Sequence, residues 1–224
     1  MALKEYALMP SQHYQDACDA IRAVTGATQL IKSGEMASLI SSIQSGNEKW
    51  KQNISGEKFA LVASDFAGVT KIRESAFEAA NLTTVEIPET ITSIGDFAFQ
   101  YSTIESVWFP DNVLEIPRYV CGNTDWLTNV RLGSYVRTIG DRAFYGSGIT
   151  EIEIPSSVTS IGSYALINGY ALTVYMLGSH PPSIEADTFR SQTLSKIVVP
   201  KGASSAYKSA TNWSAFAGFI VEAS

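Results

Sequence analysis

One short motif recurs along most of this chain, and its spacing constrains the fold more than any other feature of the sequence. The motif is an apolar residue, two variable residues and an isoleucine. Its five clear copies begin at Val69, Ile91, Val113, Val136 and Val158. Successive copies begin 22, 22, 23 and 22 residues apart. A sixth, degenerate copy passes through Ser183 and Ile184. Such a period predicts a solenoid, because each repeat can form one coil and stacked coils share a core that no single coil could bury.

Each copy of the motif is followed by two further apolar features. A small residue precedes a bulky one in the pairs Ala76-Phe77, Ala98-Phe99, Val120-Cys121, Ala143-Phe144, Ala165-Leu166 and Thr188-Phe189. A segment with the pattern apolar-x-x-apolar-x-apolar then begins at Leu82, Ile104, Leu127, Ile149, Ala171 and Leu194. Its alternation predicts a short strand that buries every second side chain. We therefore expect parallel strands, with a helical or turn segment around each Ala-Phe pair.

Proline and glycine mark the ends of these segments. Proline closes four of the strands, at Pro88, Pro110, Pro155 and Pro200. A residue without an N–H group suits a strand end. Gly95, Gly140 and Gly162 each follow the isoleucine of the motif and predict a tight corner. The expected fold is an α+β repeat protein: a solenoid of about six 22–23-residue repeats with short parallel strands, a small N-terminal helical segment and a C-terminal cap.

These phrases resemble the BspA-type, or Treponema-type, leucine-rich repeat, whose pattern is apolar-Thr-x-Ile-Gly-x-x-Ala-Phe followed by Leu-x-x-Ile-x-Ile-Pro. The resemblance covers residues 58–200. Residues 201–224, which include Tyr207 and Trp213, resemble the C-terminal cap of such arrays. Such solenoids are known in bacterial surface adhesins, in protist surface proteins and in structural proteins of phages. The resemblance implies protein or glycan binding without catalysis.

Two repeats depart from this pattern. The third has Pro117, Val120 and Cys121 where the others have glycine and Ala-Phe, and the fifth ends in the segment 178–182, Gly-Ser-His-Pro-Pro. Cys18 and Cys121 lie too far apart in sequence to indicate a disulfide framework. Since Cys121 stands where other repeats carry a core Phe, we expect it to be a small buried residue.

Residues 1–46 carry a different pattern, that of two short amphipathic helices. Ser11 and Ser33 are the expected N-caps, and Gly26 and Gly46 the expected stops. The segment resembles a module at the front of phage tail and baseplate-associated proteins. It is too small to be stable alone, so we expect either a cap over the first coil or an anchoring segment through which the chain forms a homo-oligomer. The polar residues 47–57 predict a linker.

Composition excludes several classes of function. The net charge is −6 and the sixteen basic residues are scattered, which argues against a nucleic-acid partner. There is no apolar run of about 18 residues, so no membrane span is expected. The sequence after Met1 lacks the apolar core of a secretory signal, which favours a natural start at this residue.

The sequence predicts no enzyme, no metal site and no cofactor. Its two histidines, His13 and His180, have no catalytic or metal-binding motif around them. Gly146 and Gly148 lack the lysine and the helix of a phosphate-binding loop. The pair Glu151 and Glu153 has only the spacing of alternate strand residues, and an open strand ladder is a poor glycosidase site.

The outward-facing strand positions offer a candidate binding surface. Stacking aligns one row as Glu86, Trp108, Arg131, Glu153, Tyr175 and Val198, and a neighbouring row as Thr84, Ser106, Asn129, Glu151, Thr173 and Lys196. The first five residues of the first row are the predicted binding residues, because exposed aromatic rings beside charges suit sugar stacking or a protein hot spot. The alternative is that Trp108 and Tyr175 only shield the strands.

Two functions follow as expectations. The first is a phage or prophage virion component, in a tail, baseplate or fibre, whose solenoid contacts the host surface or another virion protein. The alternative is a BspA-like adhesin on the bacterial cell surface that binds host protein or glycan.

Overall fold

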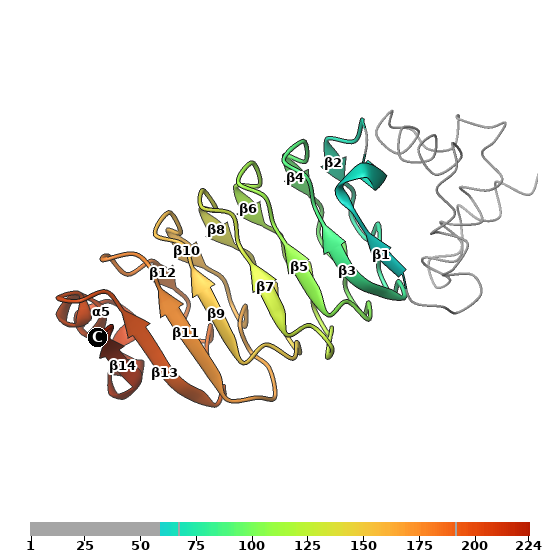
Figure 1. Cartoon of the computed structure of the whole chain (residues 1–224). Helices are drawn as coiled ribbons and strands as arrows, with labels where there is room; N and C mark the ends of the chain where they lie inside the picture. Colours follow the sequence, from blue (N-terminus) through green and yellow to red (C-terminus); the bar gives the residue numbers. More distant parts are fainter. Residues whose placement is uncertain (1–58, 67, 191) are drawn as a thin grey trace, which may run out of the picture.

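The computed structural model describes residues 59–66, 68–190 and 192–224, which form one continuous stack of coils (Figure 1). Every coil contributes a short strand, a turn segment and a longer strand, and all the strand pairs are parallel. The six short–long strand pairs confirm the predicted solenoid. The helices and linker expected in residues 1–57 lie outside the described residues.

The longer strands lie side by side along one face of the solenoid, here called the long-strand face (Figure 1). They are β1 (Phe59–Leu61), β3 (Leu82–Glu86), β5 (Ser106–Trp108), β7 (Asn129–Arg131), β9 (Glu151–Ile154), β11 (Leu172–Met176), β13 (Leu194–Val199) and β14 (Ile220–Glu222). The 3₁₀ helix η2 (Ala63–Phe66) follows β1. Hydrogen bonding divides this face into two four-stranded sheets, β1-β3-β5-β7 and β9-β11-β13-β14.

The short strands form the opposite, short-strand face. They are β2 (Lys71–Ile72), β4 (Ser93–Ile94), β6 (Glu115–Ile116), β8 (Thr138–Ile139), β10 (Ser160–Ile161) and β12 (Ser183–Ile184). This face is also divided, into the pair β2-β4 and the sheet β6-β8-β10-β12. We number the coils by their short strands, so that coil 3 contains β6 and β7.

The core lies between the two faces and is built from the residues that the repeat predicts. Phe99 and Phe144 are fully buried, as are Ile104, which precedes β5, and Val107 within β5. Cys121 is also fully buried, which confirms its predicted role as a core residue.

The small side chain of Cys121 is compensated by the large side chain of Phe109 in the neighbouring coil 2. Phe109 follows β5 in coil 2 and Phe144 belongs to coil 4, yet their ring centroids lie 6.3 Å apart at an interplanar angle of 76°. The Phe109 ring therefore crosses the layer of coil 3, where Cys121 is one ring smaller than the Phe of the repeat. The large Phe109 side chain fills the core volume that the small Cys121 side chain leaves, as close packing requires.

The turn segments form a third column of hydrogen bonds between coils. The N–H groups of Phe97, Phe99 and Tyr101 donate to carbonyls of the next coil at 2.8–3.0 Å. Phe97 and Tyr101 have φ angles of 60° and 57°. Left-handed backbone is unfavourable for residues with a Cβ, and these bonds between coils offset its cost.

The predicted corner glycines serve a different purpose from the one expected. Gly95, Gly140 and Gly162 do not adopt left-handed backbone; instead, a Cβ on any of them would lie within 2.2–2.8 Å of the preceding coil. Glycine is required here because the coils approach each other closely, so the predicted tight corner is confirmed but its physical reason is corrected.

The last residues close the open end of the stack. They form the helix α5 (Ser204–Ser209), the 3₁₀ helix η3 (Trp213–Phe219) and β14, which pairs with β13 and adds a strand to the sheet. The Tyr207 hydroxyl donates to the Gly178 carbonyl at 2.8 Å, and Trp213 Nε1 donates to the Pro182 carbonyl at 2.7 Å. The cap therefore binds the irregular segment 178–182 that departs from the repeat.

Candidate functional site

Coil 3 is joined less completely to its neighbours than the other coils are. On the short-strand face the ladder stops between β4 and β6, and on the long-strand face it stops between β7 and β9. Each interruption has a local cause in the sequence of coil 3.

Pro117 removes one of the hydrogen bonds that are missing at the first interruption. The N–H groups of Gly95, Gly140 and Gly162 each donate to an isoleucine carbonyl of the preceding coil at 2.8 Å. Pro117 takes the same position in coil 3 but has no N–H, so it cannot make this bond to the Ile94 carbonyl.

One extra residue accompanies the second interruption. A single residue separates Ser102 from Ile104 in coil 2, whereas Asp125 and Trp126 both stand between Thr124 and Leu127 in coil 3. The hydroxyls of Ser102 and Thr124 make the same type of bond, to the carbonyl three residues earlier, which fixes this alignment.

The bonding and burial beyond this insertion differ from those of coil 2. The bond from the Phe109 N–H to the Arg131 carbonyl, 2.9 Å long, has no counterpart from Leu132 to Glu153 in the described part of the chain. Val130 is only partly buried, although its counterparts Val107 and Ile152 are 0% and 2% exposed. The strands β7 and β9 are thus adjacent without forming a continuous ladder.

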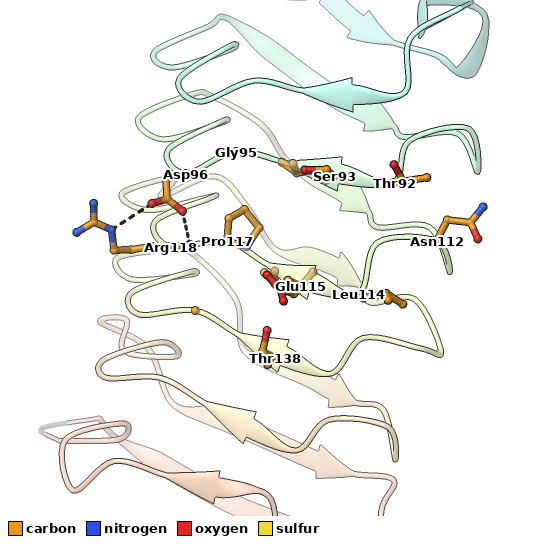
Figure 2. Close-up of a pocket in the computed structure, with 13 residues that line it drawn as sticks. Thr92, Ser93, Gly95, Asp96, Asn112, Leu114, Glu115, Pro117, Arg118 and Thr138 are labelled. Atoms are coloured by element: carbon orange, nitrogen blue, oxygen red, sulfur yellow. Dashed lines mark hydrogen bonds and ion pairs between the residues drawn. The ribbon is translucent and has the colours of Figure 1, made fainter. Parts of the chain in front are cut away.

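A hollow lies over each interruption. The first, of about 630 Å³, lies on the short-strand face and receives side chains from coils 2, 3 and 4 (Figure 2). The second, of about 1000 Å³, lies on the long-strand face over β7 and β9. These two hollows are the candidate sites.

Most polar side chains of the first hollow are already bonded within the protein. The Asp96 carboxylate lies 3.5 Å from the Arg118 guanidinium and accepts the Arg118 backbone N–H at 3.1 Å, as the dashed lines in Figure 2 show. Asn112 donates to the Glu89 carbonyl. Arg118 also lies over the Phe97 ring, 4.9 Å from its centroid. These groups have little capacity left for a ligand.

The second hollow differs because its main polar and aromatic groups are unused. Trp108, Arg131, Glu151, Glu153 and Tyr175 line it, and in the described part of the chain none of these side chains makes a hydrogen bond or ion pair. Asn129 and the hydroxyl residues Thr128 and Thr150 add further polar atoms. We call this second hollow the long-face hollow.

The structure brings together four of the five residues that the sequence singled out. Strand register places Glu86 beside Trp108, Trp108 beside Arg131, and Glu153 beside Tyr175. The two predicted rows are thus confirmed on each side of the break between β7 and β9, across which no strand pairing joins them. Glu86 lies outside the hollow, one strand beyond Trp108. Val198, also in the row, pairs with Tyr175 but does not line the hollow either.

Sequence reasoning did not select several residues that line the hollow. Glu151 belongs to the neighbouring row and was not among the predicted binding residues, although it faces the same hollow. Ser134 and Ser156 line its edge from the turns that follow the strands. Only the repeat alignment could have revealed these turn residues, because they occupy equivalent positions after β7 and β9.

The described residues show no feature of a membrane span or metal site. Within 59–66, 68–190 and 192–224, no helix is long and apolar enough to cross a membrane. In the same ranges, no group of His, Cys, Asp and Glu side chains is placed to share a metal ion. Glu151 and Glu153 are exposed on an open face, which lacks the enclosed apolar surroundings that tune a general acid.

Stacked coils of one short strand, one turn and one longer strand define this protein as a leucine-rich-repeat solenoid. The family model for the BspA type leucine rich repeat region, with six copies, matches residues 57–173 and 92–216. The chain therefore belongs to the BspA-type leucine-rich-repeat family.

Comparison with solved structures finds similar proteins. The chain is similar to a leucine rich cell surface protein from Faecalibacterium prausnitzii A2-165, with 25% identity and a TM-score of 0.41. The similarity covers 57% of this chain and 41% of that protein, so the chain spans less than half of its length. The comparison with curated proteins gives no match.

Proposed function

We propose that this chain is a non-enzymatic binding module of a bacterial cell-surface protein, and that it binds its ligand in the long-face hollow. The observation that carries the proposal is the convergence of Trp108, Arg131, Glu151, Glu153 and Tyr175, without internal partners, on one hollow. Because these side chains are not engaged within the protein, they are available to a ligand, and a hollow that combines aromatic rings with a few polar groups is typical of a binding site.

Membership of the BspA-type family supports the cell surface as the location, since repeats of this type occur in bacterial surface adhesins. The expected phage virion role rests on residues 1–46, which neither the family match nor the described structure covers. We therefore propose the adhesin function in its place.

Binding of the full chain to immobilised mucin and extracellular-matrix preparations tests the proposal. Replacing Trp108 or Tyr175 by alanine removes a ring from the hollow, and at a binding hot spot such a loss costs about 2 kcal/mol, roughly 30-fold in affinity. Tyr170→Ala is the matched control, because Tyr170 is 51% exposed, as Trp108 is 52% exposed, but does not line the hollow. If both variants bind like the parent, the long-face hollow is not the site.

Self-association through residues 1–46 is a separate proposal. Light scattering on the full chain and on a chain that starts at Ser55 compares the two molar masses. A trimer or larger assembly that dissociates on truncation supports an oligomerisation segment, whereas monomers in both cases support a cap over the first coil.

A further inference from the structure

The lining of the long-face hollow is amphipathic in a particular way. An indole lies at one side and a phenol at the other, and the floor between them carries hydroxyl, amide, carboxylate and guanidinium groups. Trp108 is 52% exposed, so much of its ring surface is open to a ligand. A ligand that matches this lining needs apolar faces for the rings and many hydroxyl groups for the floor.

We propose that the ligand is a linear, uncharged oligosaccharide that lies along the solenoid axis and contacts Trp108 and Tyr175 with different sugar units. The inference rests on the proposed binding function of the hollow. The C–H face of a pyranose packs on an aromatic ring, and its hydroxyl pairs bind carboxylate and guanidinium groups in bidentate fashion.

The distance between the two rings sets the length of the ligand. Trp108 is on β5 and Tyr175 on β11, so three strand steps separate them, roughly 14 Å at the usual strand spacing. One sugar unit of an extended chain advances by about one strand spacing. Four linked units are therefore needed for one unit to lie on each ring, and Arg131 and Glu153 lie under the two middle units of such a chain.

The interruption of the ladder supplies additional polar atoms. Between β7 and β9, the N–H of Leu132 and the carbonyl of Glu153 do not form the bond that their counterparts Phe109 and Arg131 form, within the described residues. Hydroxyl groups of a sugar both donate and accept, so a saccharide satisfies donors and acceptors in the same hollow.

The charges in the hollow disfavour a polyanion. Arg131 is accompanied by two carboxylates, Glu151 and Glu153, and the chain as a whole carries a net charge of −6. A sulfated or phosphorylated polymer would be repelled by this balance. A folded protein partner is less favoured because protein hot spots form in well-packed, desolvated pockets, whereas the floor here is open and polar.

The test is binding of the full chain to a panel of neutral linear polysaccharides, with heparin as the polyanion and fibronectin and fibrinogen as protein ligands. We expect binding to a neutral polysaccharide, with competition by its oligosaccharides that rises steeply up to four units and then levels off. Trp108→Ala and Tyr175→Ala should each weaken binding at least 10-fold, Trp108→Phe should retain most of it, and Tyr170→Ala should leave it unchanged.

Other outcomes separate this proposal from the binding function itself. If heparin or a protein ligand is bound instead, and the same two variants lose that binding, the hollow is a binding site and the saccharide proposal is overturned. If a polysaccharide is bound but both variants bind it like the parent, the site proposed for both is wrong. Absence of binding to every neutral polysaccharide also overturns the saccharide proposal.

Discussion

Pro117 occupies in coil 3 the position that Gly140 occupies in coil 4, and only Gly140 joins its coil to the one before. The Gly140 N–H donates to the Ile116 carbonyl at 2.8 Å. A Cβ on Gly140 would lie 2.8 Å from the Arg118 nitrogen, so the glycine also permits close approach. Proline removes both properties at once, which is why the short-strand ladder ends where it does.

Pro117→Gly should restore the missing bond between coils 2 and 3. The new bond stabilises the fold by about 0.5–1.5 kcal/mol. The greater freedom of glycine in the unfolded chain costs about 0.4–1 kcal/mol. The free energy of unfolding should therefore change by less than about 1 kcal/mol, while the amide introduced at residue 117 becomes protected from hydrogen exchange.

Pro88→Gly is the matched control for this substitution. Pro88 ends a strand segment and its carbonyl accepts the Ile91 N–H, a bond that the replacement leaves intact. This control should lose about 0.4–1 kcal/mol through the unfolded state alone. Equal losses in both variants, together with rapid exchange of the amide at 117, would show that Pro117 does not cause the interruption.

Cys121→Phe restores the residue typical of the repeat and should nevertheless destabilise the protein. The space is already crossed by the Phe109 ring, which reaches Phe144 in coil 4. Overpacking of a core costs about 1–3 kcal/mol, measurable by urea denaturation. Phe109→Ile alone should be destabilising as well, because it leaves a cavity.

The double variant tests whether these two positions share one volume. Cys121→Phe with Phe109→Ile should be more stable than the sum of the single effects predicts, by about 1 kcal/mol or more, since each change compensates for the other. Additive losses would mean that the Phe109 ring does not occupy the layer of coil 3.

Gly148→Ala should destabilise the protein, because a Cβ at this residue would lie 2.4 Å from the Asp125 carbonyl oxygen. That atom belongs to the backbone of coil 3 and cannot move aside cheaply, so we expect a loss of about 1–3 kcal/mol. Gly169→Ala is the control, since no atom lies within 4 Å of its Cβ. It should stabilise by about 0.4–1 kcal/mol in thermal unfolding; a loss as large as that of Gly148→Ala would contradict the close approach.

The solenoid and the alignment of its rows could be predicted because both depend only on periodicity. A strand buries every second residue, so once the repeat is aligned, Trp108 must lie beside Arg131 on the outer surface. The core positions follow in the same way, including Cys121, since a position defined by the repeat stays buried even when its residue changes.

The hollows could not be predicted in this way, because they arise from exceptions to the repeat. Pro117 was visible as a departure, but its consequence depends on a hydrogen bond to a residue 23 positions earlier in sequence. The insertion at Trp126 precedes a strand that pairs with β5 but not with β9, and no pattern within one coil reveals that difference. Left-handed backbone at Phe97 and Tyr101 is likewise imposed by bonds to the next coil.

Tyr207 in the cap makes the free energy of unfolding depend on pH. Burial raises the pKa of this phenol from 10.0 to about 12. Because the folded pKa lies above the unfolded one, the folded state favours the neutral phenol. The stabilisation is fully present below pH 10 and is lost as the pH rises from about 10 to about 12.

Tyr207→Phe tests this contribution. At pH 8 the variant should be less stable by about 1–3 kcal/mol, since the Gly178 carbonyl loses the hydroxyl that donates to it at 2.8 Å. Between pH 10 and pH 12 the parent should lose stability faster than the variant, so the difference between their free energies of unfolding should shrink. Tyr135→Phe, at a residue 64% exposed, should follow the parent at every pH. A difference that stays constant up to pH 12 would mean that the Tyr207 phenol titrates normally in the folded protein.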